Sequence, residues 1–102
     1  MKNSTIEVRG CRGYDKVTGA ISFPIYQSAT FRHPALGQST GYDYSRVKNP
    51  TREELEDTIA LLEGGKKAWA FSSGMAAIGA LLKLFKSGDH IILSEDLYGG
   101  TT

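Results

Sequence analysis

The chain has 102 residues, which is enough for one domain at most, with a small core. Its hydrophobic content of 40%, charged content of 23% and net charge of +1 are ordinary for a globular protein, and they give no electrostatic reason to expect a nucleic acid or a membrane as partner. The first residues lack the apolar stretch of a signal peptide, and no apolar run approaches the roughly 20 residues of a membrane span. We therefore expect a cytoplasmic protein.

Residues 1–50 show no sustained helical or strand period, and they contain five glycines and three prolines. Aromatic side chains such as Tyr42 and Tyr44 make this segment too apolar for a disordered tail. A structureless stretch of this length is also unusual inside a compact domain. Two interpretations are open: an extended arm that lies on another subunit, which we favour, and a poorly ordered terminus.

The single cysteine, Cys11, lies in this segment and cannot form a disulfide within the chain. No second cysteine or nearby histidine stands at the spacing of a metal site. We expect neither a bound metal nor a catalytic thiol.

A helix is predicted from Thr51 to the Gly64-Gly65 pair. Thr51 is the expected N-cap, and Glu54 three residues later would complete a capping box. Four carboxylates crowd the first turns, and we attribute them to capping, the helix dipole and solvation rather than to metal or acid–base chemistry. These residues are Glu53, Glu54, Glu56 and Asp57.

Residues 68–93 carry the pattern of a strand, a helix and a second strand. Residues 68–71 are a short apolar strand, residues 75–85 place apolar side chains at helical spacing, and residues 90–93 form a second apolar run. Two parallel strands joined by a crossover helix form a βαβ unit. Because this unit cannot cover both faces of a parallel sheet, we expect the chain to be the front part of a larger α/β protein.

The predicted functional region is the turn from Ser72 to Met75 that precedes this helix. Its small residues leave backbone N–H groups free at a helix N-terminus, where the dipole favours an anion. The turn is neither a P-loop nor a GxGxxG motif, and tight packing alone would also explain its small residues. Tyr44 with Arg46 could bind a phosphate, and Tyr98 could stack on a flat ring, but each signal is weak by itself.

Together, four motifs in chain order resemble the Cys/Met-metabolism family of pyridoxal-phosphate enzymes, which includes cystathionine γ-synthases, cystathionine β- and γ-lyases and methionine γ-lyases. The motifs are Tyr44-Ser45-Arg46, Asn49-Pro50-Thr51, Ser73 to Ala77, and Asp96 to Thr101. The resemblance runs from about Tyr14 to the last residue and corresponds to the opening quarter of the family's chains.

The resemblance implies a fold class. Residues 1–50 would be an N-terminal arm for subunit contact. Residues 51–102 would begin the large α/β domain of a fold-type-I transferase, with the first βαβ unit as its opening element. The complete enzyme would be a homodimer or homotetramer.

The resemblance also implies a role for each site residue. The backbone amides of Gly74 and Met75 would hold the phosphate of pyridoxal 5'-phosphate. Tyr44 and Arg46 would reach the same phosphate from a neighbouring identical subunit. Tyr98 would stack on the pyridine ring and act as a catalytic residue in proton handling. The full set of implied cofactor contacts is Tyr44, Arg46, Ser73, Gly74, Met75 and Tyr98.

The implied activity is β- or γ-elimination, or γ-replacement, on the small amino-acid substrates cystathionine or an O-acylhomoserine, in transsulfuration and methionine biosynthesis. Methionine γ-lyases tend to carry cysteine where this chain has Gly100, which favours a cystathionine or O-acylhomoserine substrate. The family's Schiff-base lysine and the aspartate that pairs with the pyridine nitrogen lie further downstream, so we expect the 102-residue chain alone to be inactive. Because two strands and two helices leave at least one face of the sheet uncovered, we also expect the chain alone to be marginally folded. Two alternatives are a truncated, non-enzymatic chain that associates with partner subunits, and an unrelated phosphate-binding α/β domain.

Overall fold

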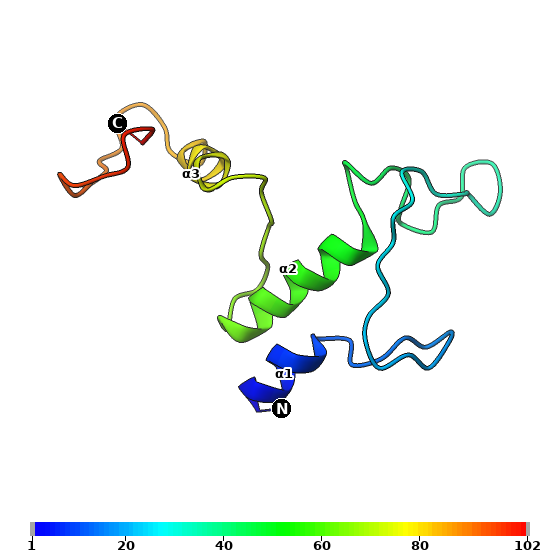
Figure 1. Cartoon of the computed structure of the whole chain (residues 1–102). Coiled ribbons are helices and arrows are strands. Elements are labelled where there is room, and N and C mark those ends of the chain that lie inside the picture. Colours follow the sequence, from blue (N-terminus) through cyan, green and yellow to red (C-terminus); the bar gives the residue numbers. More distant parts are fainter. Residues whose placement is uncertain (1, 102) are drawn as a thin grey trace. The chain divides into compact units, whose positions relative to one another are not determined.

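The computed structural model describes residues 2–101, which form three helices joined by long loops (Figure 1). The helices are α1 (Asn3–Arg9), α2 (Pro50–Leu62) and α3 (Gly74–Leu82). The chain divides into two compact units, Met1–Trp69 and Ala70–Thr102. None of the helices formed by the described residues has the length and apolar character needed to cross a lipid bilayer.

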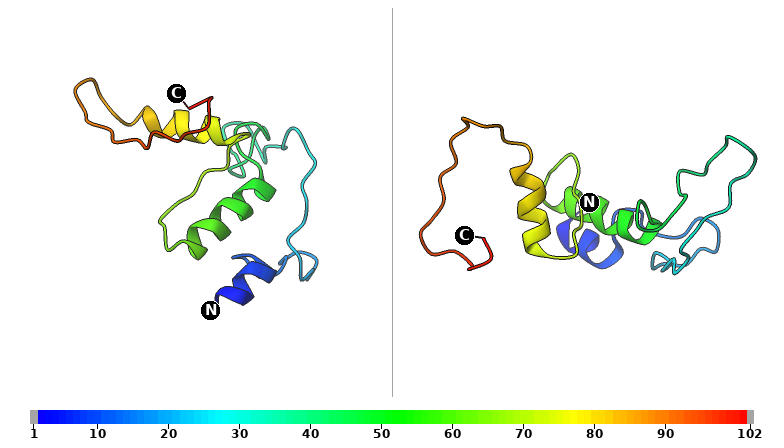
Figure 2. Two further views of the ribbon diagram at one scale, coloured as in Figure 1. Left: turned by 60° about the vertical axis from the view of Figure 1, so that its left-hand side comes forward. Right: turned by 90° about the horizontal axis from the view of Figure 1, so that it is seen from above.

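Helix α1 lies in a segment for which the sequence predicted no regular element. It ends at Gly10, which has a φ of 71° and donates its N–H to the carbonyl of Ile6 at 2.8 Å. Ile6 is only 4% exposed, and α1 packs against α2, so that the two helices lie side by side in Figures 1 and 2. The helix escaped prediction because seven residues are too few for a helical period to emerge.

The predicted helix after the arm is confirmed as α2, but its N-terminal cap is not the expected one. The side chain of Asn49 accepts the N–H of Thr51 at 2.8 Å, and Pro50 occupies the first helical position. The hydroxyl of Thr51 instead accepts the N–H of Tyr26, also at 2.8 Å. The predicted capping box between Thr51 and Glu54 is therefore wrong, because both side chains bind the arm.

The carboxylates in the first turns of α2 hold residues 11 and 12 to the helix. Glu54 is only 8% exposed; it accepts the backbone N–H of Cys11 at 3.0 Å and lies 3.2 Å from Nε of Arg12. Arg12 also forms ion pairs with Glu53 at 2.9 Å and Asp57 at 3.4 Å. The prediction that capping and solvation explain this cluster is wrong for Glu53 and Glu54.

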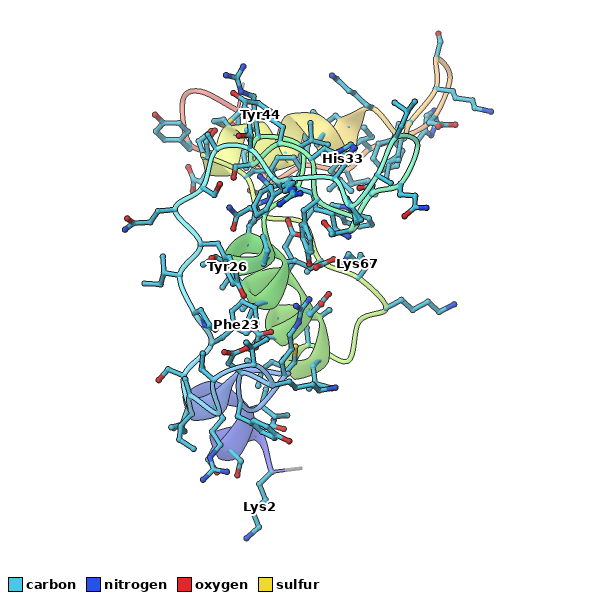
Figure 3. The ribbon with its side chains drawn as sticks, turned by 90° about the vertical axis from the view of Figure 1, so that its right-hand side faces the viewer. Lys2, Phe23, Tyr26, His33, Tyr44 and Lys67 are labelled. Atoms are coloured by element: carbon cyan, nitrogen blue, oxygen red, sulfur yellow. The ribbon has the colours of Figure 1, made fainter. Side chains whose placement is uncertain are left out.

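The arm packs on the α2 helix of its own unit. Figure 3 shows Phe23 and Tyr26 on the extended segment beside α2, and their ring centroids lie 6.0 Å apart. Further along, an isolated antiparallel bridge joins Thr30 to Tyr44 and closes the loop between them. The side-chain amide of Asn49 donates to the carbonyl of Tyr26 at 3.1 Å, which links the arm to the start of α2.

Helix α3 confirms the helix predicted over residues 75–85, although it ends at Leu82. Ser73 is its N-cap, with the hydroxyl accepting the N–H of Ala76 at 3.1 Å. Beyond Leu82 the hydrogen bonds are of the 3₁₀ type, since the N–H groups of Leu84 and Phe85 donate to the carbonyls of the residues three positions earlier. The apolar pattern continues there, but the α-helical hydrogen bonds do not.

The two strands expected on either side of α3 are not formed by the described residues. Residues 68–71 and 90–93 have no regular secondary structure, and their side chains are open to solvent: Trp69 is 69% exposed and Ile92 is 98% exposed. A strand satisfies its backbone N–H and C=O groups by pairing with a neighbouring strand, and a parallel sheet needs cover on both faces. Within residues 2–101, only the helix of the predicted βαβ unit is present.

Candidate functional site

A cavity of about 410 Å³ lies at the N-terminus of α3, within the second unit. The hydroxyl of Thr101, in the C-terminal loop, contacts the sulfur of Met75 in the first turn of α3, and the ribbon of this loop is drawn in orange and red in Figure 2. Cavities of roughly 300–1,000 Å³ are the usual size of small-molecule sites. The lining residues are Ser73, Gly74, Met75, Ile78, Tyr98 and Thr101. Four of them, all except Ile78 and Thr101, are among the predicted cofactor contacts.

The first turn of α3 presents free hydrogen-bond donors to this cavity. Gly74 and Met75 occupy the first two helical positions, where an N–H group has no acceptor within the helix. The hydroxyl of Ser73 is taken by the N–H of Ala76, and the amides of Gly74 and Met75 have no acceptor among residues 2–101. With the positive end of the helix dipole behind them, these two donors favour an anion.

The space beside Gly74 is open. Apart from its chain neighbours and the backbone of its own helix, a Cβ added at this position would meet no atom of the described residues within 4 Å, and the backbone φ lies outside the left-handed region that favours glycine. Neither packing against the rest of residues 2–101 nor a positive φ therefore requires glycine here. The open side of the backbone leaves room for a ligand to approach the N–H groups closely.

Tyr98 reaches the cavity from the C-terminal loop. It begins a turn in which the N–H of Thr101 donates to the carbonyl of Tyr98 at 2.7 Å. The hydroxyl of Thr101 contacts the sulfur of Met75 at 3.3 Å, which ties this turn to the first turn of α3. Tyr98 is 75% exposed, so its ring is available to a ligand.

Sequence reasoning missed Ile78 and Thr101 as site residues. Each stands three positions after a predicted one, since Ile78 follows Met75 on the same face of α3 and Thr101 closes the turn that starts at Tyr98. A spacing of three residues is the signal that could have identified Ile78 and Thr101. By itself, however, this spacing indicates only an apolar helix face and a turn.

Tyr44 and Arg46 belong to the first unit and form a pair of their own. The guanidinium of Arg46 donates to the hydroxyl of Tyr44 at 3.0 Å, and its central carbon lies 5.5 Å from the centre of the Tyr44 ring. Both side chains are exposed, and Figure 3 shows Tyr44 on its loop. A hydroxyl and a guanidinium held together in this way suit the recognition of a phosphate.

A second hollow, of about 540 Å³, lies in the first unit and contains none of the predicted site residues. Its walls are mainly aromatic, with cationic and acidic side chains at the edge. The lining residues are Arg12, Tyr14, Asp15, Lys16, Phe23, Tyr26, Phe31, Tyr42 and Pro50. Within the described residues, no group of three or more histidine, cysteine, aspartate or glutamate side chains could hold a metal ion.

The charged cluster beside this hollow shifts the pKa values of two side chains, Glu53 and Cys11. Hydrogen bonds from the Tyr42 hydroxyl, and then from Lys48 and Arg12, outweigh burial and lower the pKa of Glu53 to about 2. Burial and then the neighbouring Glu54 carboxylate raise the pKa of the Cys11 thiol. A thiol with a raised pKa is a poor nucleophile, so this cluster is a structural clamp between the arm and α2.

Comparison with known proteins identifies the family. Residues 4–102 match the family described as Cys/Met metabolism PLP-dependent enzyme. The chain is 54% identical over 101 residues to the cystathionine gamma-lyase of Bacillus subtilis (strain 168), covering 99% of this chain and 27% of the relative. It is 61% identical over 87 residues to the cystathionine gamma-synthase/O-acetylhomoserine (thiol)-lyase of the same organism, and the match covers 85% of this chain and 23% of the relative. The crystal structure of cystathionine gamma-lyase from Lactobacillus plantarum complexed with L-serine superimposes with a TM-score of 0.85 at 50% identity, covering 99% of this chain and 26% of that chain.

The chain therefore belongs to the Cys/Met-metabolism family of PLP-dependent enzymes. The family resemblance predicted from the four motifs is confirmed, and the cofactor that the family uses is pyridoxal phosphate. The solved structures that resemble this chain include a cystathionine gamma-lyase, a cystathionine gamma synthase and a methionine gamma lyase, which agrees with the fold-type-I prediction. The chain spans about a quarter of the length of the relatives that it matches.

Proposed function

We propose that the chain supplies the N-terminal quarter of a pyridoxal-phosphate enzyme of sulfur amino-acid metabolism. The reaction is β- or γ-elimination, or γ-replacement, on cystathionine or an O-acylhomoserine. The observation that carries this proposal is the cavity at the N-terminus of α3, where Ser73, Gly74, Met75 and Tyr98 meet. The names of the relatives, which are cystathionine lyases and synthases, support the substrate class.

The residues around the cavity suit pyridoxal phosphate. The free N–H groups of Gly74 and Met75 hold the phosphate, and the open side of Gly74 allows the phosphate to approach the backbone. The exposed ring of Tyr98 would stack on the pyridine, and its hydroxyl would take up or release a proton on the substrate side. When bound, pyridoxal phosphate supplies an electron sink that makes the α-proton of an amino acid easier to remove.

The remaining contacts come from a neighbouring identical subunit of a dimer or tetramer. Residues 1–50 are the arm that makes this contact, and Tyr44 and Arg46 carry a hydroxyl and a guanidinium to the phosphate of the adjoining site. Their mutual hydrogen bond and their exposure support this assignment. Residues 51–102 begin the cofactor-binding domain, in which residues 68–71 and 90–93 pair as strands once the rest of the sheet is present.

The test requires the whole enzyme. It is obtained by extending the reading frame beyond Thr102, or by joining this chain to the remaining three quarters of the Bacillus subtilis cystathionine gamma-lyase in place of the matching quarter. The expected result is a protein that binds pyridoxal phosphate and, only with it, converts cystathionine or O-acetylhomoserine. A well-folded whole enzyme that does not bind the cofactor would contradict the proposal.

One alternative is a non-enzymatic chain that associates with partner subunits. The exposed apolar side chains of Trp69 and Ile92 are the observation that favours it. A stop codon directly after Thr102, together with a chain that associates with enzyme subunits but leaves their turnover unchanged, would support this alternative.

A further inference from the structure

The side chain of Arg52, in the first turn of α2, binds the backbone of the turn that carries Tyr44 and Arg46. Its Nη1 donates to the carbonyls of Ser45 and Arg46 at 3.3 and 3.4 Å, and its Nη2 donates to the carbonyl of Val47 at 2.6 Å. One guanidinium thus binds three successive carbonyls, which requires several N–H donors in a rigid, planar fork. Arg52 therefore connects the backbone of this turn to α2.

The guanidinium is itself held on the helix. Its Nε lies 3.7 Å from a carboxylate oxygen of Glu56, which stands one helical turn further on. The side chains of Arg52 and Glu56 are only 34% and 13% exposed. An ion pair at this i,i+4 spacing keeps the guanidinium close to α2, so the carbonyls of the turn are bound by a cation that the helix positions.

The turn requires a connection of this kind because its own hydrogen bonds are local. The N–H groups of Val47 and Lys48 both donate to the carbonyl of Tyr44, at 3.0 and 2.9 Å. These two bonds determine the shape of the turn, but they do not fix its position on the helix. Because Arg52 binds the backbone, the exposed side chains of Tyr44 and Arg46 stay available to a ligand.

We propose that Arg52 is a positioning residue, which holds residues 45–47 on α2 so that Tyr44 and Arg46 reach the phosphate in the site of the adjoining subunit. This inference rests on the proposed function of Tyr44 and Arg46. Arg52→Lys separates positioning from charge, because an ammonium keeps the charge and the pairing with Glu56 but cannot bind carbonyls on both sides of the turn at once.

The experiment uses Arg52→Lys in the whole enzyme, with Arg32→Lys as the matched control. Arg32 is exposed in the loop before Tyr44, and its guanidinium forms no hydrogen bond or ion pair with another of residues 2–101. We expect Arg52→Lys to weaken the affinity for pyridoxal phosphate about tenfold, because the phosphate contacts are displaced. Arg32→Lys should leave this affinity unchanged, and equal affinities in the two variants would overturn the inference.

Mixed assemblies distinguish positioning from a structural defect. When Arg52→Lys subunits are combined with Gly74→Val subunits, some sites join an intact Gly74 turn to an arm whose Arg52 is intact. These sites should bind the cofactor with the parent affinity, although they lie in the subunit that carries Arg52→Lys. A structural defect would remain in that subunit. Weak binding at every site, in a preparation where Arg46→Ala subunits do recover with the same partner, would therefore overturn the inference.

A parent enzyme that binds no pyridoxal phosphate, or no recovery when Arg46→Ala and Gly74→Val subunits are mixed, would instead overturn the proposed function. The position of the turn is then decided in the cofactor-free whole protein, by hydrogen exchange at the amides of Val47 and Lys48. Exchange about tenfold faster in Arg52→Lys than in Arg32→Lys supports the inference, and equal exchange overturns it.

Discussion

In the proposed site, Gly74 is the residue on which the phosphate contact would depend most directly. Replacing it with valine places a branched side chain in the space that the structure leaves open, next to the two free amides. Because a hydrogen bond to a charged group contributes about 1.5–3 kcal/mol, we expect Gly74→Val to weaken cofactor binding roughly 10- to 100-fold in the whole enzyme.

The control for this variant is Gly79→Val in the same helix, where an added Cβ also meets no atom within 4 Å. Gly79 is not among the residues lining the cavity, so its replacement should leave cofactor affinity unchanged. Equilibrium dialysis of both variants against pyridoxal phosphate provides the comparison. Equal losses would mean that the turn is a packing feature and not a phosphate site.

Glu53 gives a prediction about pH. Its pKa lies at about 2 in the folded chain, below the ordinary value of 4.5, so Glu53 stabilises the fold above pH 4.5 and this stabilisation is lost as the pH falls toward 2. The shift corresponds to about 3 kcal/mol. We expect Tyr42→Phe to raise the pKa of Glu53 toward 4.5, because the Tyr42 hydroxyl is the main donor to its carboxylate.

Carbon NMR titration of the Glu53 carboxyl measures this pKa directly. Tyr14→Phe is the matched control, since Tyr14 lines the same hollow but makes no hydrogen bond to Glu53. A titration midpoint of Glu53 near pH 4.5 in the parent chain would show that the cluster does not lower the pKa of Glu53. A midpoint that is the same in the parent chain and in Tyr42→Phe would show that the Tyr42 hydroxyl is not the cause.

At the scale of elements, the contact between α1 and α2 depends on Gly10. An alanine there would be strained by its φ of 71°, and its Cβ would overlap the Glu54 carboxylate. Gly13 has a similar φ of 79° but open space beside it. Both replacements place a side chain at a positive φ, which costs about 1–3 kcal/mol, but only Gly10→Ala also displaces Glu54 from the backbone N–H of Cys11.

We therefore expect Gly10→Ala to release α1 from α2, while Gly13→Ala strains only its own loop. Hydrogen exchange at the α1 amides reports this release. Exchange should be about tenfold or more faster in Gly10→Ala than in Gly13→Ala, which is the effect of losing a further ~1.4 kcal/mol. Similar exchange in the two variants would show that Glu54 does not hold the helices together.

The elements differ in how far the sequence could predict them. The α2 and α3 helices could be predicted from the spacing of apolar residues. The free N–H donors of Gly74 and Met75 could be predicted because these residues stand at the start of a helix. Both signals are local in the sequence. The cap of α2 was misassigned because Asn49 and Thr51 are equally good capping residues, and only the contact of Thr51 with Tyr26 decides between them.

Contacts between distant residues had no such signal. Arg12 meets carboxylates more than 40 positions away, and Thr101 meets Met75 across 26 positions, so neither pairing could be inferred from local spacing. The apolar runs at residues 68–71 and 90–93 predict strands, but a strand depends on pairing with a neighbouring strand, and neither segment has such a partner among residues 2–101.

In the whole assembly, we expect each cofactor site to be shared between two subunits. Arg46→Ala and Gly74→Val should each reduce cofactor binding in a pure assembly. When subunits of the two kinds are mixed, some sites combine an intact Gly74 from one subunit with an intact Arg46 from its neighbour. We therefore expect part of the cofactor binding and turnover to return on mixing, whereas no recovery would place Arg46 in the same subunit's site or outside the site.

We propose that the first turn of α3 and the Tyr98 ring hold pyridoxal phosphate. A crystal structure of the whole enzyme with the cofactor bound would show these contacts or their absence. We expect phosphate oxygens about 2.7–3.2 Å from the backbone nitrogens of Gly74 and Met75, with the Tyr98 ring stacked on the pyridine. A phosphate bound by other residues, with the amides of Gly74 and Met75 turned to water or to protein, would show that this turn is not the phosphate site.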